Sequence, residues 1–576
     1  MNKMGKYQYF AQHMHMHSSY QPGGSMEGHL FHAANMGMKY IWFTDHDIRM
    51  GRKRFQIDGF DFEEDTLFVE EANGRSHGFQ MHEEETEDSQ WKAVLTGETS
   101  FTGSQCLKIS GNSHGNVWKG LSVSFSSSGR RHCASLMAGI TLEIAVLAKE
   151  FKDCRVILDV QMSQRPPEHT CAHLLYVIGD MDGLEAQPHT VVIPLASTEG
   201  WHKYILNLSE DVTNAYAHDK RVGGLDNAFD TISLRVEAKN RSAVAYFDDF
   251  IIRILKNCEE TRSEQKRVAA ELGRQYGITT FVATEISAAG PHKNCFSTTV
   301  PIIPYDKFDY RLTHEEAIAW VQKHGGIFAL NHPFEEYKKM VLDEAQKEMC
   351  LRNKADEFIQ NKAWGASLIE VGYPMGRSTF SLQMHLRLWD KLTEAGVFLT
   401  GYGSSDNHSN KTKWYDDNNF AAWIGVEAEE AEPIKEEAFI AAMKSGNVYT
   451  GNPVVLKGQV SLETEDGVPM GSVLITGDEA FSTKILFQSE VQAGWHFRFV
   501  SNGEVVSDRI LDEKKWNPDN RFEFSYKMTA TKPVNFVRAE MYDENGLCIM
   551  LTNPIHIWRK DLCNVLHMHT ERMILT

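Results

Sequence analysis

The sequence of residues 12–47, QHMHMHSSYQPGGSMEGHLFHAANMGMKYIWFTDHD, decides the fold that we predict for this chain. It begins inside an extended run, 7–17, that has the pattern of a β-strand. Residues two apart in a strand share a face, so the imidazoles of His15 and His17 are expected to converge on one point. Two imidazoles in that arrangement suit a divalent transition metal.

The second half of the same stretch predicts a helix and another strand. Ser25 is the expected N-cap of a short amphipathic helix over 25–36, and Gly37 is its stop. A buried strand over 39–44 follows and ends in Asp45-His46-Asp47. The stretch therefore predicts a strand, helix, strand unit with metal-binding groups at the ends of both strands, the edge at which α/β proteins hold their sites.

The size and composition of the chain predict a multidomain globular protein. It has 576 residues, 42% of them hydrophobic, which is too long for one core, and about three domains are expected. We find no apolar run long enough to cross a bilayer, and the first residues lack the apolar segment of a secretory signal. Nine scattered cysteines favour a reducing compartment, so we expect a cytoplasmic protein.

The charge of the chain argues against a long nucleic acid as its partner. The net charge is −19, whereas affinity for a polyanion comes largely from Lys and Arg. A small anionic group remains a candidate, because Arg49 and Arg52 closely follow His46 and guanidinium groups suit phosphate or carboxylate oxygens. A solvated loop that leads into the next domain is an equal alternative for these arginines.

Residues 57–255 change character and predict a β-sandwich. Short strands with Gly, Ser and Asn between them replace the strand and helix alternation. The pattern resembles the jelly rolls of carbohydrate-binding modules. Trp118 and Trp201 are candidates for stacking on sugars, although aromatic residues in sandwiches are more often core residues, and we favour the core interpretation. The same resemblance implies a structural Ca²⁺ held by Asp248 or Asp249 together with Glu63 or Glu64.

The α/β pattern resumes after the sandwich, which is therefore expected to be an insertion. A helix over 263–277 and a strand over 278–287 are predicted, and Glu285 lies near the end of that strand. Thr313 to Glu316 form a capping box before another helix. Metal-ligand residue types then recur at the ends of two further predicted strands, His332 in GGIFALNHP and the pair Asp406 and His408 in VFLTGYGSSDNH.

Four of these motifs together resemble the polymerase and histidinol phosphatase (PHP) family of metallohydrolases. They are HMHS (15–18), TDHD (44–47), GGIFALNHP (325–333) and the final GSSDNH (403–408). The resemblance is nearest to the carbaryl-hydrolase-like subgroup and covers about two-fifths of the chain. It implies an α/β fold, a distorted (β/α)7 barrel of the PHP type, with an inserted β-sandwich and a C-terminal β-sandwich. The expected boundaries are 1–56 and 256–453 for the two parts of the barrel, 57–255 and 454–560 for the two sandwiches, and 561–576 for a tail.

The resemblance also implies the residues of the site. Two or three divalent ions, Mn²⁺, Zn²⁺ or Fe²⁺, are expected, with Glu285 as the bridging ligand. The implied metal ligands are His15, His17, His46, Glu285, His292, His332, Asp406 and His408. The candidate catalytic residues are Asp47, Glu285 and His292, and Asp47 is either a proton donor to the leaving group or a cap for the following loop. Arg49, Arg52 and Arg377 are the candidate substrate-binding residues. The sequence departs from the family at 21–23, where Gln-Pro-Gly stands in place of Ser-Asp-Gly, and Pro291 replaces a glycine before His292.

These expectations lead to a functional hypothesis with two alternatives. We expect a metal-dependent phosphoesterase that uses a metal-activated hydroxide on a small anionic or glycoconjugate substrate. A carbamate, ester or amide hydrolase is the alternative within enzymes, because the subgroup resemblance favours it. A catalytically inactive glycan-binding protein is the alternative of another class, because two sandwiches are predicted. No membrane or long nucleic acid is expected as a partner.

Overall fold

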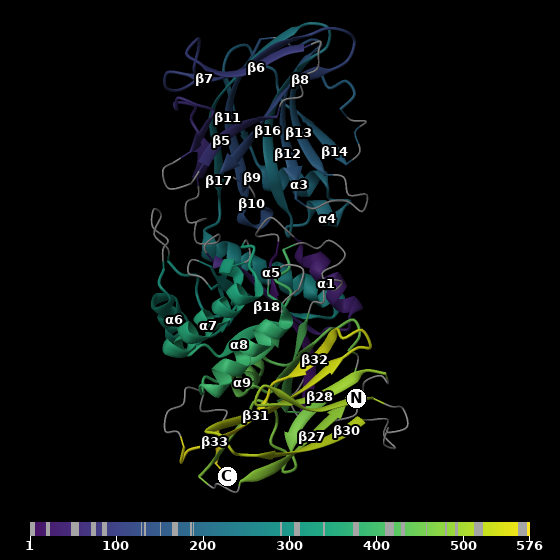
Figure 1. The fold of residues 1–576 in the computed structure, drawn as a ribbon. Helices are drawn as coiled ribbons and strands as arrows, with labels where there is room; N and C mark the ends of the chain where they lie inside the picture. The colour runs from purple at the N-terminus through teal and green to yellow at the C-terminus, as the bar shows by residue number, and fades with distance from the viewer. Residues whose placement is uncertain are drawn as a thin grey trace. The chain divides into compact units, whose positions relative to one another are not determined.

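The computed structural model covers the whole chain and describes most of it (Figure 1). The residues outside the described part are 1–5, 19–23, 48–56, 71–75, 83–88, 128–129, 132–133, 150, 164–170, 185–186, 188, 288–290, 305–311, 338–339, 373–379, 409–419, 428–432, 457, 478–480, 490–493, 512–521, 563–572 and 576. Within the described part, no helix is both long enough and apolar enough to span a membrane.

The chain divides into two compact units, and one of them is inserted into the other. Unit 1 comprises Met1–His17, Gly28–Ile48 and Ala269–Thr576, and unit 2 comprises Ser18–Glu27 and Arg49–Val268. The division falls within helices α1 (Met26–Asn35) and α5 (Cys258–Tyr276). The chain therefore has more than one domain.

Unit 2 consists of two β-sheets. The nine-stranded sheet follows the order β14-β13-β12-β16-β8-β5-β4, with β9 and β10 beside it, and the six-stranded sheet follows the order β15-β11-β17-β7-β6, with β3 beside it. Helices α3 and α4 lie at one end of the strands (Figure 1). The elements are β3 (Ile57–Phe60), β4 (Phe68–Glu70), β5 (Ser76–His82), β6 (Ser89–Thr96), β7 (Cys106–Ser113), β8 (Lys119–Ser127), β9 (Arg130–Arg131), β10 (Ala134–Ser135), η1 (Leu136–Ala138), β11 (Ile140–Ala148), β12 (Cys154–Met162), β13 (His173–Gly179), β14 (Thr190–Pro194), β15 (His202–Leu206), α3 (Leu208–Ala215), α4 (Lys220–Gly223), β16 (Ala228–Ala238) and β17 (Ser242–Ile254).

Alternation along the strands explains why two sheets form. In β12 the apolar side chains of Val156, Leu158 and Val160 belong to the hydrophobic core, whereas Asp159 and Gln161 on the other face are only partly buried. Ile157, also on that other face, is buried in a small separate cluster. Successive strand residues point to opposite faces, so this pattern gives each sheet one apolar face to bury against the other. The β-sandwich that the sequence predicts for this part of the chain is confirmed.

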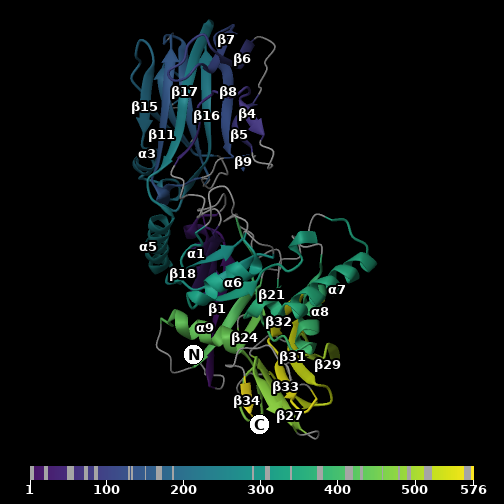
Figure 2. The same ribbon diagram turned by 90° about the vertical axis from the view of Figure 1, so that its left-hand side faces the viewer.

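Unit 1 begins with the predicted strand, helix, strand unit and continues after the insertion. Figure 2 shows its helices α7 and α8 side by side. The elements that precede the C-terminal strands are β1 (Tyr7–Met16), α1, β2 (Tyr40–His46), α5, β18 (Thr279–Ile286), β19 (Lys293–Phe296), α6 (His314–Lys323), β20 (Ile327–Leu330), η2 (Glu335–Tyr337), α7 (Glu344–Gln360), η3 (Lys362–Gly365), β21 (Leu368–Gly372), α8 (Leu382–Glu394), β22 (Thr400–Gly403), β23 (Ala421–Glu427), α9 (Glu436–Ser445) and β24 (Val448–Gly451).

The strands of unit 1 form a mixed sheet rather than a barrel, so the predicted (β/α)7 barrel of the PHP type is wrong. The described strands follow the order β22-β21-β20-β19-β18-β2-β1-β23-β24-β32-β31-β33-β26-β34 in a 16-stranded sheet, and this order does not return to its start. β1, β2 and β18 are parallel, as are β20, β21 and β22. However, β19 is antiparallel to β18 and β20, and β23 is antiparallel to β1. A barrel of this type requires parallel strands all round, each reached by a crossover helix.

The C-terminal strands continue the same sheet and add a small second one. The second sheet has three strands in the order β25-β27-β30. The Phe497 ring packs on Phe487 and Phe524, with ring centroids 4.5 and 4.6 Å apart, which joins the two sheets through aromatic side chains. The strands are β25 (Val460–Thr464), β26 (Val473–Thr476), β27 (Ser482–Ser489), β28 (His496–Ser501), β29 (Glu504–Ile510), β30 (Phe522–Thr529), β31 (Val534–Tyr542), β32 (Cys548–Thr552), β33 (Ile555–Arg559) and β34 (Met573–Leu575). β34 lies within the expected tail and pairs with β26.

Candidate metal centre

Histidines and carboxylates gather in unit 1 where neighbouring strands end. His15 lies near the end of β1, His17 directly follows that strand, and His46 is the last residue of β2. β18 runs parallel to β2 with Glu285 opposite His46 in the register. Parallel strands end at the same edge of a sheet, so residues far apart in the sequence meet there.

Loops beyond three other strands supply the remaining side chains. His292 directly precedes β19, His332 follows β20, and Asp406 and His408 follow β22. His332 has a φ value of 24°, which residues other than glycine seldom adopt, and Asp406 has a φ value of 48°, in the left-handed region that Asp tolerates better than most residues. Backbone strain of this kind is concentrated at functional sites, where the surrounding structure holds it.

The carboxylate of Glu285 lies at the middle of the cluster and is fully buried. Its Oε1 atom is 3.2 Å from His15 Nε2 and 3.3 Å from both His292 Nδ1 and His332 Nε2. Its Oε2 atom is 2.5 Å from His46 Nδ1. Glu285 therefore contacts histidines from four different segments of the chain.

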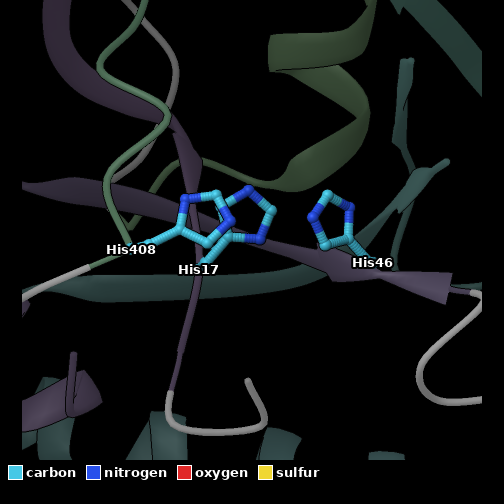
Figure 3. Close-up of side chains that lie close together, drawn as sticks. All are labelled: His17, His46 and His408. Carbon is cyan, nitrogen blue, oxygen red and sulfur yellow. The ribbon is translucent and has the colours of Figure 1, made fainter. Parts of the chain in front are cut away.

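Asp406 lies beside the two histidines of β1 and the segment after it. Its Oδ1 atom is 3.0 Å from His17 Nε2, 3.4 Å from His15 Nε2 and 3.5 Å from His408 Nδ1. Figure 3 shows the His408 ring lying over that of His17, with His46 to one side. The centroids of the His17 and His408 rings are 3.9 Å apart, and the rings are stacked.

The cluster holds its carboxylates ionised. Burial alone would raise the pKa of Glu285, but the neighbouring histidines, above all His46 and His292, bring that pKa well below its usual value. Burial likewise acts to raise the pKa of Asp406, and His15 and His408 hold it well below its usual value. Both carboxylates are therefore in the charged form that binds cations.

Four of the histidines fall into two classes. Burial lowers the pKa of His17 and of His408, so both rings are neutral, the form in which imidazole binds a metal. Burial also acts to lower the pKa of His15 and His332, but adjacent carboxylates raise it, to about 10 for His332. These two rings carry a proton that a metal ion would replace.

The arrangement fits metal ions better than hydrogen bonds alone. Among the described residues, neither His46 Nδ1 nor Glu285 Oε2 makes a hydrogen bond of normal geometry, although the two atoms are 2.5 Å apart. Ligands about 2.0–2.1 Å from one tetrahedral ion lie about 3.3–3.5 Å from each other, close to most of the separations in this cluster. Four groups of described residues have ligand atoms near enough to share an ion: His17, His46 and His408; His15, His17 and Glu285; His46, Glu285 and His292; and His292, His332 and Glu335.

Three polar residues that the sequence analysis did not single out support the cluster. Asn331 Nδ2 donates to Glu285 Oε1 over 2.8 Å. Glu370 Oε1 is hydrogen-bonded to His15 Nδ1 over 2.6 Å, and Glu335 Oε2 lies 2.6 Å from His332 Nδ1. Glu370 has a signal in the sequence, because it is the one charged residue in the apolar run SLIEV (367–371).

Asp47, the predicted proton donor, lies at the edge of the cluster. Its side chain is buried, and Oδ1 accepts a hydrogen bond from the backbone N–H of Ser287 over 3.1 Å. Lys293 is also buried, and burial lowers the pKa of its amine to about 7 while Asp47 acts to raise it. The predicted substrate-binding residues Arg49, Arg52 and Arg377, and the departure from the family pattern at 21–23, lie outside the described residues.

In unit 2 the carboxylates predicted to hold Ca²⁺ accept backbone hydrogen bonds. Asp248 Oδ2 accepts from the N–H groups of Phe101 and Thr102, and Glu63 Oε1 accepts from those of Ser104 and Gln105. The carboxylates therefore order one loop of the sandwich, and the calcium ion stays a prediction.

The two tryptophans of unit 2 lie outside its hydrophobic core, contrary to the core interpretation. The Arg155 guanidinium covers the ring of Trp118, 3.9 Å from the ring centroid. Trp201 is partly exposed, donates through Nε1 to Thr99 Oγ1, and lies 6.0 Å from the ring of Phe101.

No protein-family model and no curated protein matches the sequence. Solved structures that resemble part of it include carbohydrate-binding modules of the β-sandwich superfamily, at 16% identity and a TM-score of 0.20, covering 33% of this chain and 59% of that one. The Endo-D glycoside hydrolase domain of Streptococcus pneumoniae R6 matches at 11% identity and a TM-score of 0.18, covering 31% of this chain and 21% of that one. The family 11 carbohydrate-binding module of Clostridium thermocellum, in complex with a tetrasaccharide, matches at 10% identity and a TM-score of 0.21, covering 35% of this chain and 97% of that one.

The first two of these structures are matched over less than two thirds of their own length. Similarities at such low TM-scores carry no inference about fold or activity. The functional interpretation therefore rests on the side chains of this chain.

Proposed function

We propose that this protein is a metal-dependent hydrolase of phosphate esters, related to the PHP metallohydrolases through its motifs. One observation carries the proposal: Glu285 is fully buried, and four histidines from separate segments approach its two oxygens. An isolated buried charge costs several kcal/mol, so such a gathering requires compensation, and bound cations provide it. Imidazole and carboxylate ligands without thiolate suit Zn²⁺, Mn²⁺ or Fe²⁺.

The residues that would hold the ions form two overlapping sets that share Glu285. His15 and His17 also lie beside Asp406, and His292 and His332 both approach Oε1 of Glu285. His46 and His408 complete the set near His17. Bound together, two divalent ions would supply an activated water at neutral pH and positive charge for the oxygens of a phosphoryl group.

The chain's own residues prepare the site for that chemistry. Neutral His17 and His408 present lone pairs, and ionised Glu285 and Asp406 supply negative charge. Asn331 holds Oε1 of Glu285 in place through its amide N–H. His17, Glu285 and Asn331 are fully buried, which keeps bulk water from them and strengthens each electrostatic interaction that they make.

The substrate class rests on the family resemblance, and a carbamate, ester or amide is the alternative. Both reactions use the same kind of metal centre, so a substrate comparison separates them. Purified protein would be assayed with nitrophenyl phosphate, bis(nitrophenyl) phosphate and naphthyl carbamate, each with and without Mn²⁺. Metal-dependent release of nitrophenol from either phosphate ester is the expected result. Turnover of the carbamate alone would overturn the phosphoesterase assignment and leave a metal-dependent hydrolase.

The metal content of the protein tests the proposal more directly. Elemental analysis of protein purified without added metal is expected to find at least about one divalent ion per chain, because the ligands come from a single preorganised cluster. The variant Glu285→Ala is the control and is expected to lose that metal. A wild-type protein with no bound metal, no metal affinity and no activity would contradict the proposal.

Glycan binding by unit 2 is a second candidate function, and the exposed aromatic pair Phe101 and Trp201 favours it. Phe101 is 38% exposed, and the Trp201 ring is partly exposed beside it. A partly exposed aromatic ring with its N–H hydrogen-bonded is a suitable stacking surface for a sugar. A glycan array with the full chain and with Trp201→Ala tests this candidate. We expect at least a fivefold loss of binding, about 1 kcal/mol, in the variant and no loss in Val117→Ala, which removes an exposed apolar side chain elsewhere.

A further inference from the structure

In two histidines of the candidate metal centre, the two ring nitrogens face different carboxylates. His15 Nε2 is 3.2 Å from Glu285 Oε1, and His332 Nε2 is 3.3 Å from the same atom. The opposite nitrogen, Nδ1, of each ring lies 2.6 Å from a second carboxylate, Glu370 for His15 and Glu335 for His332. Each ring thus lies between the central carboxylate and an outer one.

The Glu370 carboxylate accepts hydrogen bonds from several segments of the chain. It is fully buried, and its Oε1 atom accepts hydrogen bonds from Ser404 over 2.6 Å and from Tyr402 over 3.1 Å, in addition to its bond with His15. Its Oε2 atom accepts the backbone N–H of His332 over 2.6 Å. Four donors therefore fix the carboxylate, and it contacts both histidines that flank Glu285.

An ionised carboxylate can only accept a hydrogen bond, so the nitrogen that faces it must carry the proton. The proton of His15 is then on Nδ1 whenever the ring is neutral, and the lone pair is on Nε2, which faces Glu285. His332 Nδ1 lies 2.6 Å from Glu335 Oε2 without normal hydrogen-bond geometry, so here the nearby carboxylate favours a proton on Nδ1 through its negative charge. A metal ligand must present a lone pair, so these two contacts select the tautomer that a metal requires.

A purely structural role for the two carboxylates is the competing explanation. Burial would account for Glu370, because a buried charge needs partners. It does not account for Glu335, whose side chain is 25% exposed and could be satisfied by water. The two glutamates come from different elements, β21 and η2, yet each lies 2.6 Å from Nδ1 of a histidine at the centre.

We propose that Glu370 and Glu335 are positioning residues that hold His15 and His332 with Nε2 directed at the bound metal. This inference rests on the proposed metal-dependent function and assigns the two glutamates a role in metal affinity. Glutamine keeps the shape of the side chain but can donate to Nδ1, which would move the ring proton to Nε2 and block the lone pair there. Glu370→Gln and Glu335→Gln are therefore the informative variants.

The test is competition for Zn²⁺ between the full-length metal-free protein and a chromophoric chelator at constant pH. Partners in this outer position are worth about 10–100-fold in metal affinity, so each variant is expected to bind Zn²⁺ about 10–100-fold more weakly than the wild type. The visible absorption of the Co²⁺-loaded protein is the second readout. It is expected to change in both variants, because the ring nitrogen that faces the metal changes.

Two matched controls separate a positioning role from a structural one. The first control is Glu336→Gln. Glu336 is the neighbour of Glu335 in the sequence, and its Oε1 atom lies 2.7 Å from Lys354 Nζ. Glu540→Gln removes a buried carboxylate that pairs with Arg538 over 2.8 Å in the C-terminal strands. Both controls are expected to keep the wild-type Zn²⁺ affinity and Co²⁺ spectrum, even where the Glu540 variant is less stable.

The outcomes distinguish this inference from the proposed function. A wild-type protein that binds Zn²⁺ no better than Glu285→Ala overturns the proposed function. A wild-type protein that binds Zn²⁺, together with Glu335→Gln and Glu370→Gln variants within twofold of it, overturns the inference and leaves the function. If Glu370→Gln does not fold, Glu335→Gln decides alone, because its side chain is partly exposed and its loss leaves no empty buried space.

Discussion

The middle of the candidate metal centre in unit 1 and the interior of unit 2 are both buried but are opposite in chemistry. Glu285, His15 and His17 have no exposed side-chain surface, and neither do Leu158 and Leu234 in the sandwich. In unit 2 the burial of apolar surface is itself the favourable term in folding. In unit 1 the burial of charged groups is unfavourable, so something other than packing maintains the cluster.

A single carboxylate in each unit makes the difference concrete. Asp226 in unit 2 is 4% exposed and accepts the backbone N–H of Glu27 over 3.1 Å. Burial raises the pKa of Asp226 to about 6, whereas histidines hold the pKa of Glu285 well below its usual value. A buried carboxylate without cationic neighbours tends to take up a proton, and one among imidazoles stays ionised and available to a metal.

The largest effect that we expect comes from removal of the shared carboxylate of unit 1. Glu285→Ala should lower the hydrolytic activity by at least about 10³-fold, or about 4 kcal/mol of transition-state stabilisation, because both sides of the centre lose a ligand. Steady-state rates on the ester that the wild type hydrolyses would measure this loss of activity. Glu344→Ala, a change at an exposed helix residue, is the control. If Glu285→Ala retains a tenth of the wild-type activity, Glu285 is not the shared metal ligand.

The matching change in unit 2 should affect stability and leave metal binding intact. Leu234 belongs to the sandwich core and is fully buried, so Leu234→Ala is expected to destabilise unit 2 by about 2–5 kcal/mol. Denaturant unfolding would measure the loss of stability. The Zn²⁺ content of the variant should equal that of the wild type. Val94→Ala, at a position 44% exposed, is expected to cost less than about 0.5 kcal/mol. An effect of Leu234→Ala below 1 kcal/mol would contradict the account of the core.

Metal loading should stabilise unit 1 selectively. At a Zn²⁺ concentration 100 times the Kd, binding adds about 2.7 kcal/mol to the stability of the form that binds the ion. Hydrogen exchange should therefore slow by up to about 100-fold in β18 and β20, while β12 and β16 of unit 2 keep their rates. A chelator should reverse the change. Equal slowing in both units would indicate that the ion does not act through the predicted ligands.

A smaller effect, with a distinctive pH dependence, is expected for Asp226→Asn. The folded-state pKa of Asp226, about 6, lies above its unfolded value, so its contribution to stability is present at low pH and is lost as the pH rises through 6. Asn carries no charge at any pH, so the variant should be about 2–3 kcal/mol more stable than the wild type at pH 7.5 and should match it at pH 3.5. Thermal or denaturant unfolding at the two pH values measures this. A variant less stable than the wild type at pH 7.5 would show that the Asp226 carboxylate is stabilising.

Local structure was predictable where the signals are local. The helix expected over 25–36 is α1, Met26–Asn35, and the capping box from Thr313 to Glu316 is confirmed at the start of α6. Helix α5 begins earlier than the predicted 263, because Asn257 caps it: its Oδ1 accepts the N–H groups of Glu259 and Glu260. An Asn followed three residues later by a Glu is a helix-start signal that the sequence analysis overlooked.

The sequence by itself determined which histidines and carboxylates stand at strand ends, because period-two and helical patterns, stops and caps are written in neighbouring residues. The tertiary structure alone decided how the strands pair, and it replaced the expected closed barrel with a mixed sheet in which β19 and β23 run antiparallel. It also decided that Glu370 and Glu335 reach His15 and His332. Strand direction and side-chain contacts across long sequence separations depend on packing between distant segments, and no local pattern encodes that packing.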